Sequence, residues 1–122
     1  TICSEANCVV TAVQDVNCYY GGSSYYAGGM VIFDATYGST TYTFKLIHVY
    51  KNVSVGQKLS AGEAVVDIIT GADHDKIKNC STGSHLHLET KVNGSTVDPM
   101  EVMTTSTSSG GFGCNISACP VP

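Results

Sequence analysis

The chain has 122 residues, a formal net charge of −4 and a charged fraction of only 13%. A chain of this length can bury a core, so we expect a single domain over residues 1–122. Its six Lys and Arg residues form no basic run, and no apolar run is long enough to cross a bilayer. These features argue against nucleic acid, an anionic membrane surface or a membrane span.

Runs rich in Val, Ile, Thr, Tyr and Phe alternate with turn residues along the chain, a pattern typical of strands. We expect strands at residues 9–13, 29–33, 40–48, 63–69, 85–92 and 96–97. Turns are expected at 21–24, at 37–39 and at Asn93-Gly94, which is the strongest hairpin signal. There is no convincing amphipathic helix, although Asp98-Pro99 predicts one helical turn capped by Asp98. The sequence therefore predicts an all-β fold.

The even number of cysteines predicts an oxidising compartment, up to three disulfides and a secreted protein. They are Cys3, Cys8, Cys18, Cys80, Cys114 and Cys119. The last two are expected to anchor a Ser/Thr/Gly-rich strap at 104–122, and the Cys3/Cys8 pair to tie down the other end. Sequence alone does not choose among the possible pairings. The glycosylation sequons at Asn52, Asn79, Asn93 and Asn115 agree with secretion.

Residues 81–89 read Ser-Thr-Gly-Ser-His-Leu-His-Leu-Glu and contain the densest chemistry of the chain. Two leucines alternate with His85, His87 and Glu89, which is the period-2 pattern of a strand. We therefore expect both imidazoles on one face. Such a pair can share a metal ion, or one can bind metal while the other handles a proton.

In chain order, His48 is followed by V-S-V-G-Q-K-L, then by S-T-G-S-H-L-H-L-E, then by V-N-G-S-T-V-D-P. Residues 9–103 on this basis resemble the lysostaphin/LytM-type zinc endopeptidases, secreted β-proteins that cut peptide cross-links in bacterial cell walls. The resemblance implies a small twisted β-sandwich or roll, here stapled by disulfides. It also implies that His87 binds zinc, and that His85 and His48 orient or deprotonate the metal-bound water.

The chain departs from this family at the other two zinc ligands, a His and an Asp upstream of the first strand. Residues 1–8 contain neither, whereas a catalytic zinc site normally has three protein ligands. Our first interpretation is a non-catalytic extracellular binding or structural protein that needs no zinc. Its groove, lined by His48, His85, His87 and Glu89, would take a peptide, a glycan or another protein.

Two further interpretations remain open. In one, the loop between residues 69 and 81 rebuilds the zinc site, with His74 and either Asp73 or Asp75 joining His87 in an active metalloendopeptidase. A solvated acidic loop is the plainer explanation of those three residues. In the other, the domain is a self-assembling extracellular building block whose contacts are tyrosines, for which the pairs at 19–20 and 25–26 are candidates.

Overall fold

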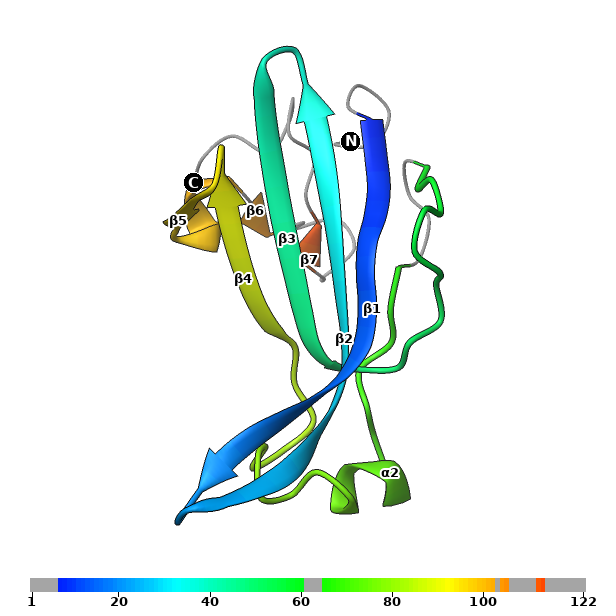
Figure 1. The fold of residues 1–122 in the computed structure, drawn as a ribbon, viewed down its shortest axis with the longest axis vertical. Coiled ribbons are helices and arrows are strands. Elements are labelled where there is room, and N and C mark those ends of the chain that lie inside the picture. Colours follow the sequence, from blue (N-terminus) through cyan, green and yellow to red (C-terminus); the bar gives the residue numbers. More distant parts are fainter. Residues whose placement is uncertain (1–6, 61–64, 103, 106–111, 114–122) are drawn as a thin grey trace.

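The computed structural model describes residues 7–60, 65–102, 104–105 and 112–113. Its main feature is one open, antiparallel five-stranded sheet with the strand order β1-β2-β3-β4-β5 (Figure 1). These strands are β1 (Asn7–Tyr20), β2 (Ser23–Tyr37), β3 (Thr40–Val49), β4 (His87–Val92) and β5 (Ser95–Val97). A second small sheet pairs β6 (Thr104–Thr105) with β7 (Phe112–Gly113). The all-β prediction is confirmed.

Within the described residues, helical structure is confined to two short pieces, α2 (Ala72–Asp75) and η1 (Pro99–Glu101). The predicted cap of the second is confirmed, because the Asp98 side chain accepts a hydrogen bond from the Met100 amide at 2.9 Å. In the part of the chain that the structure describes, no helix has the length and apolar character needed to cross a membrane.

Two of the predicted turns close tight hairpins. Gly21 and Gly22 have φ of 58° and 82°, and Asn93 and Gly94 have φ of 49° and 84°. Two consecutive positive φ angles are the mark of the type I′ turn, whose twist matches that of antiparallel strands. The hairpin predicted at Asn93-Gly94 is therefore confirmed.

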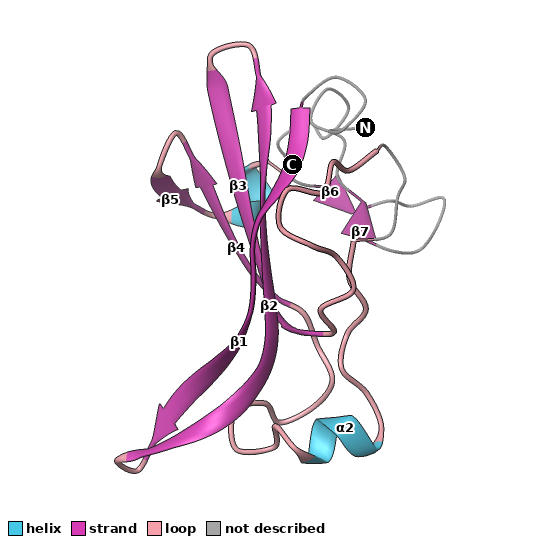
Figure 2. Cartoon of the chain, turned by 45° about the vertical axis from the view of Figure 1, so that its right-hand side comes forward, coloured by secondary structure: helices cyan, strands magenta, loops and turns pink. Residues whose placement is uncertain are grey.

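The strand predictions at 9–13, 29–33 and 63–69 were wrong in their bounds. β1 and β2 extend far beyond the predicted segments, and their far ends bend away from the sheet as a two-stranded arm (Figure 1, Figure 2). The predicted strand at 63–69 is not a regular strand over its described residues, 65–69, where only Ile68 forms a bridge, to Val49. Two backbone bonds flank this bridge, from the Tyr50 amide to Asp67 and from the Ile69 amide to His48.

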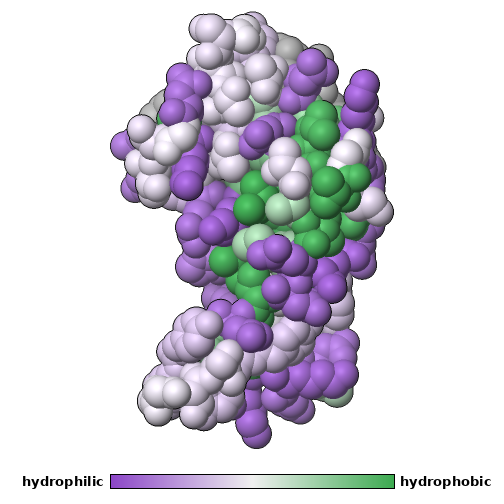
Figure 3. Space-filling view, viewed as in Figure 1, coloured by the Kyte–Doolittle hydropathy of each residue, from purple (hydrophilic) through white to green (hydrophobic). Residues whose placement is uncertain are grey.

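The core lies on one face of the sheet and under the segment that follows β3. Phe33 and Phe44 stack with ring centroids 5.0 Å apart at its centre. The other buried members are Cys8, Val10, Val31, Ala35, Leu46, Val49, Val53 and Leu59. Residues 53–59 also pair with the edge of β1, since the Val10 amide donates to Gln57 and the Leu59 amide donates to Cys8. In the surface view, hydrophobic residues gather over the middle of the sheet and over this neighbouring segment (Figure 3).

One disulfide within the described residues joins Cys18 to Cys80. Cys8 is disulfide-bonded as well. The proposed pairing of Cys8 with Cys3 involves a residue outside the described part. The predicted roles of Cys114, Cys119 and Asn115, and most of the strap at 104–122, also lie outside it.

Candidate functional site

His48 is held in an unusual backbone conformation at the end of β3. Its φ of 67° is rare for a residue other than glycine. The residue opposite His48 is Gly28, whose φ is 94°. A Cβ atom on Gly28 would lie only 3.3 Å from the His48 Cα. The ring is buried, and its Nδ1 donates a hydrogen bond of 2.7 Å to the Ala27 carbonyl. This bond leaves Nε2 as the nitrogen with a free lone pair.

The surroundings of His48 favour its neutral form. Burial lowers the pKa of the imidazole below its usual value, although the bond to Ala27 acts in the opposite direction. The neighbouring imidazoles of His85, His87 and His74 lower the pKa further. His48 therefore remains an uncharged acceptor at neutral pH.

His85 and His87 both lie against this ring. The centroid of the His48 ring is 4.9 Å from that of His85 and 6.0 Å from that of His87. The prediction that both belong to one strand was wrong for His85, because β4 begins at His87. His85 Nδ1 instead donates to the Gly83 carbonyl at 2.7 Å, a local bond that holds residue 85 in the preceding turn.

Glu89 lies beside His87 as its place in the sequence suggested. The His87 Nε2 donates a hydrogen bond of 2.9 Å to a Glu89 carboxylate oxygen. The other Glu89 oxygen is 3.9 Å from the Lys45 ammonium. His48, His85 and His87 thus each have one nitrogen fixed by an acceptor of the same chain, while the other nitrogen faces away from that bond.

Ser81 links two of the imidazoles and was not singled out from the sequence. Its buried hydroxyl lies 3.1 Å from His74 Nε2 and 3.2 Å from His85 Nδ1, and it donates to the Gly83 carbonyl at 2.8 Å. The loop at 69–81 therefore brings His74 to the border of the histidine cluster. The Ser-Thr-Gly turn before His85 was the available sequence signal.

The two acidic residues of that loop are placed differently. The Tyr50 hydroxyl donates to Asp73 at 2.8 Å, and Lys76 lies 3.2 Å from the same carboxylate. The bond from Tyr50, followed by the bond and charge of Lys76, lowers the pKa of Asp73. Asp75 is exposed on α2. The structure thus brings His74 to the cluster but directs Asp73 to Tyr50.

Comparison with known protein families matches residues 2–99 to Peptidase family M23. The match covers most of the chain. The chain belongs to peptidase family M23. No curated protein and no solved structure matched it.

The M23 family implies zinc, and the donor groups of this domain can be tested for it. Among residues 7–60 and 65–102, no group of three or more His, Cys, Asp or Glu side chains is placed to hold a metal ion. His87 Nε2 is bonded to Glu89, and His74 Nε2 is bonded to Ser81. The Asp73 carboxylate accepts hydrogen bonds from Tyr50 and Lys76. The described residues therefore do not fit a three-ligand zinc site, and the metal role of His87 stays a prediction.

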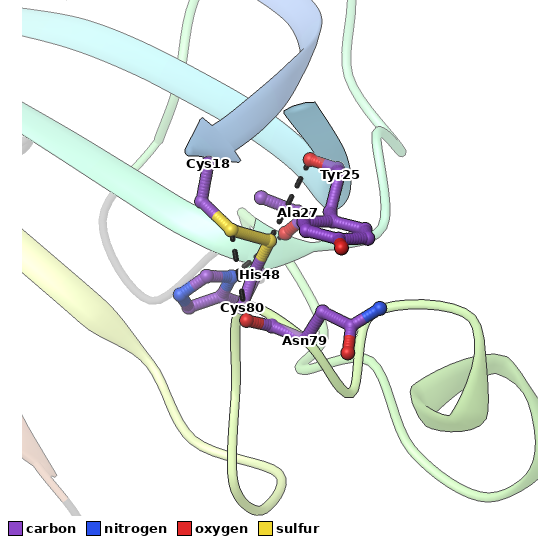
Figure 4. Close-up of a disulfide and its surroundings, with 6 residues drawn as sticks. All are labelled: Cys18, Tyr25, Ala27, His48, Asn79 and Cys80. Atoms are coloured by element: carbon purple, nitrogen blue, oxygen red, sulfur yellow. Dashed lines mark hydrogen bonds between the residues drawn. A yellow bond between two sulfur atoms is a disulfide. The ribbon is translucent and has the colours of Figure 1, made fainter. Parts of the chain in front are cut away.

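The disulfide of the M23 domain lies next to the histidine cluster (Figure 4). Cys18 contacts the Asn79 carbonyl at 3.7 Å, and Cys80 contacts the Tyr25 carbonyl at 3.5 Å. Tyr25 lies two residues before Ala27, which accepts the bond from His48. The cross-link therefore joins the arm to the turn that precedes His85.

The sequons within the described part of the M23 domain are all on exposed residues, at Asn52, Asn79 and Asn93. Asn93 has a structural role, because its Oδ1 accepts a hydrogen bond from the Thr41 amide at 2.9 Å. Their glycosylation stays a prediction.

Proposed function

We propose that this M23 domain binds an extended peptide beside the histidine cluster without cutting it. The observation that carries the proposal is a partly uncovered edge of β4. β5 pairs only with Thr90, Lys91 and Val92, whereas β4 itself begins at His87. No described strand pairs with residues 87–89 on the side away from β3.

The backbone groups at this edge have a defined direction. Val92 and Ser95 close a two-residue hairpin, so their amide and carbonyl groups point toward each other. By the alternation of antiparallel strands, the same groups of Thr90 and Leu88 also point away from β3. Leu88 therefore presents one N–H and one C=O that an added peptide strand can pair with.

The imidazoles supply the side-chain part of such a site. The nitrogens of His48, His85 and His87 that are not fixed internally accept hydrogen bonds from peptide N–H groups while the rings are neutral. The opposite charges of Lys45 and Glu89 lie next to the same edge. Backbone pairing with β4 would give the peptide its affinity, and hydrogen bonds to the imidazoles would fix its register along the strand.

The internal bonds of Asp73 support a non-catalytic role, because its carboxylate would have to leave Tyr50 and Lys76 before it met His74 and His87 at one ion. An active zinc endopeptidase is the second candidate. It is favoured by the fixed ring nitrogens, since metal-binding histidines are normally oriented by such bonds. The Cys18–Cys80 disulfide supports an extracellular location for either function.

The test is titration of the purified chain with capped, β-favouring hexapeptides, followed by amide NMR. We expect shifts at His87, Leu88 and Glu89, and loss of binding when the peptide amides that face the edge are N-methylated. Peptides methylated on the opposite amides serve as the matched control. His87→Ala should weaken binding, because it removes one acceptor at an exposed position.

Elemental analysis of the same sample separates the two candidates. Stoichiometric zinc that disappears in His87→Ala, together with cleaved peptides, would establish the enzyme and reject the binding-only role. Intact peptides and equal binding before and after chelation are expected instead.

A further inference from the structure

We propose a second binding site, for a neutral pyranose glycan, on the arm formed by β1 and β2. The site goes beyond the peptide function, because it shares no residue with the β4 edge. Its surface, here called the tyrosine face, consists of Asp15, Asn17 and Tyr19 on β1 with Ser24 and Tyr26 on β2. The register pairs Asn17 with Tyr26 and places Tyr19 opposite Ser24.

Strand alternation puts these side chains on one side of the arm. Asp15, Asn17 and Tyr19 are two residues apart along β1, so they share a face. The hydroxyl of Tyr26 donates to Asp15 at 3.2 Å, which places β2's contribution on the same side. Tyr19 is 83% exposed and Tyr26 is 41% exposed, so two aromatic rings are available to a ligand.

The opposite side of the arm is already engaged. Cys18 is bonded to Cys80 there, and Tyr25, its register partner, contacts Cys80 through its carbonyl. The disulfide therefore attaches one side of the arm to the body of the domain and leaves the tyrosine face directed outward. Figure 1 shows the arm extending from the rest of the sheet.

A pocket of about 250 Å³ adjoins this face and includes Tyr26 in its wall. The lining residues are Tyr26, Gly29, Val49, Tyr50, Lys51, Ile69, Asp73 and Lys76. Its wall combines tyrosine and aliphatic side chains with three charged ones, Lys51, Asp73 and Lys76. The volume lies just below the roughly 300–1,000 Å³ of common small-molecule sites, so the pocket suits about one sugar unit.

The charges at this site cancel in pairs. The Lys51 ammonium is 3.0 Å from Asp15, and that of Lys76 is 3.2 Å from Asp73. Each of the four charged side chains of the tyrosine face and the pocket is therefore paired, and residues 16–26 contain no charged side chain. Exposed rings beside carboxylate, amide and hydroxyl groups instead match a neutral pyranose, whose C–H face stacks on tyrosine and whose hydroxyls hydrogen-bond.

The experiment is isothermal titration of the purified chain with chitohexaose and cellohexaose, with heparin as the charged control. We expect one of the neutral oligosaccharides to bind and heparin not to bind. Tyr19→Ala should weaken binding about tenfold, which corresponds to about 1.4 kcal/mol and is near the upper end of what one aromatic contact contributes. Tyr37→Ala is the matched control, because Tyr37 is 50% exposed but lies at the other end of β2.

Three results would overturn the proposal. One is no heat with either oligosaccharide at millimolar concentration, and another is an equal loss in Tyr37→Ala. The third is concentration-dependent self-association in the ultracentrifuge that disappears in Tyr19→Ala, which would assign the tyrosine face to a second copy. His87→Ala should leave glycan binding unchanged, so failure of the peptide function and failure of the glycan site are distinguishable.

Discussion

At the scale of single residues, His48 is held both by its backbone conformation and by its ring. It is buried, has φ of 67°, and is fixed through Nδ1 to Ala27. Positive φ in a non-glycine residue costs on the order of 1–3 kcal/mol and persists where the surroundings enforce it. Here those surroundings are Gly28 and the two neighbouring imidazoles.

The lowered pKa of His48 predicts a pH-dependent stability. Below its usual pKa of 6.5 the unfolded chain binds a proton that the folded chain resists. Stability should therefore fall as the pH drops through 6.5, and the loss should level off below the folded-state pKa. Each unit of lowering corresponds to about 1.4 kcal/mol.

Urea unfolding of the wild type and His48→Asn between pH 8 and 5 measures this effect. Asparagine tolerates positive φ but does not titrate, so the unfolding free energy of the variant should depend less steeply on pH than that of the wild type. The same pH dependence of stability in the two proteins would contradict its assignment to His48.

At the scale of elements, the cluster depends on the close approach of β2 and β3. A Cβ on Gly28 would lie 2.7 Å from the Ile69 side chain, and one on Gly29 would lie 2.5 Å from the Val49 carbonyl. Only glycine permits this approach, which allows β3 to turn at His48 while staying attached to β2. The register shift between Gly29 and Met30 marks the same place.

Gly28→Ala is expected to destabilise the domain by about 1–3 kcal/mol, because it adds a clash at a residue whose φ is 94°. Gly83→Ala is the matched control, since a Cβ there meets nothing within 4 Å and its φ is not positive. Thermal or urea denaturation compares the two. Similar losses in both variants would show that the approach of the strands is not the cause.

At the scale of the whole molecule, the Cys18–Cys80 disulfide connects the arm with the turn before His85. It closes a loop with a sequence separation of 62. By chain-entropy arithmetic such a loop contributes about 4 kcal/mol, mainly by restricting the unfolded chain. It also cross-links the arm that carries the tyrosine face to the segment that leads into His85.

The double variant Cys18→Ser/Cys80→Ser is expected to lose about that amount, on the order of 4 kcal/mol, in denaturant unfolding. The double substitution is preferable to a reducing agent, because Cys8 is also disulfide-bonded. A loss below about 1 kcal/mol would mean that the arm is held in place by its other contacts.

Local chemistry explains which predictions succeeded. The Asn93-Gly94 turn and the Asp98 cap depend on a few adjacent residues, so both were predictable. The start of β4 was not, because the bond from His85 to Gly83 competes with the alternating pattern. The length of the arm was missed because its residues are polar or aromatic and their pairing partners depend on the register of β1 with β2.

By itself the sequence determined the all-β class, the family, and the three imidazoles at positions 48, 85 and 87, because strand patterns and short motifs are local properties. Only the tertiary structure decided how those imidazoles meet. Their arrangement depends on the Ala27 carbonyl, the Ser81 hydroxyl and the Gly28 approach, which come from distant parts of the chain. The same holds for the tyrosine face and its pocket, whose residues are brought together by strand register and by the loop carrying α2.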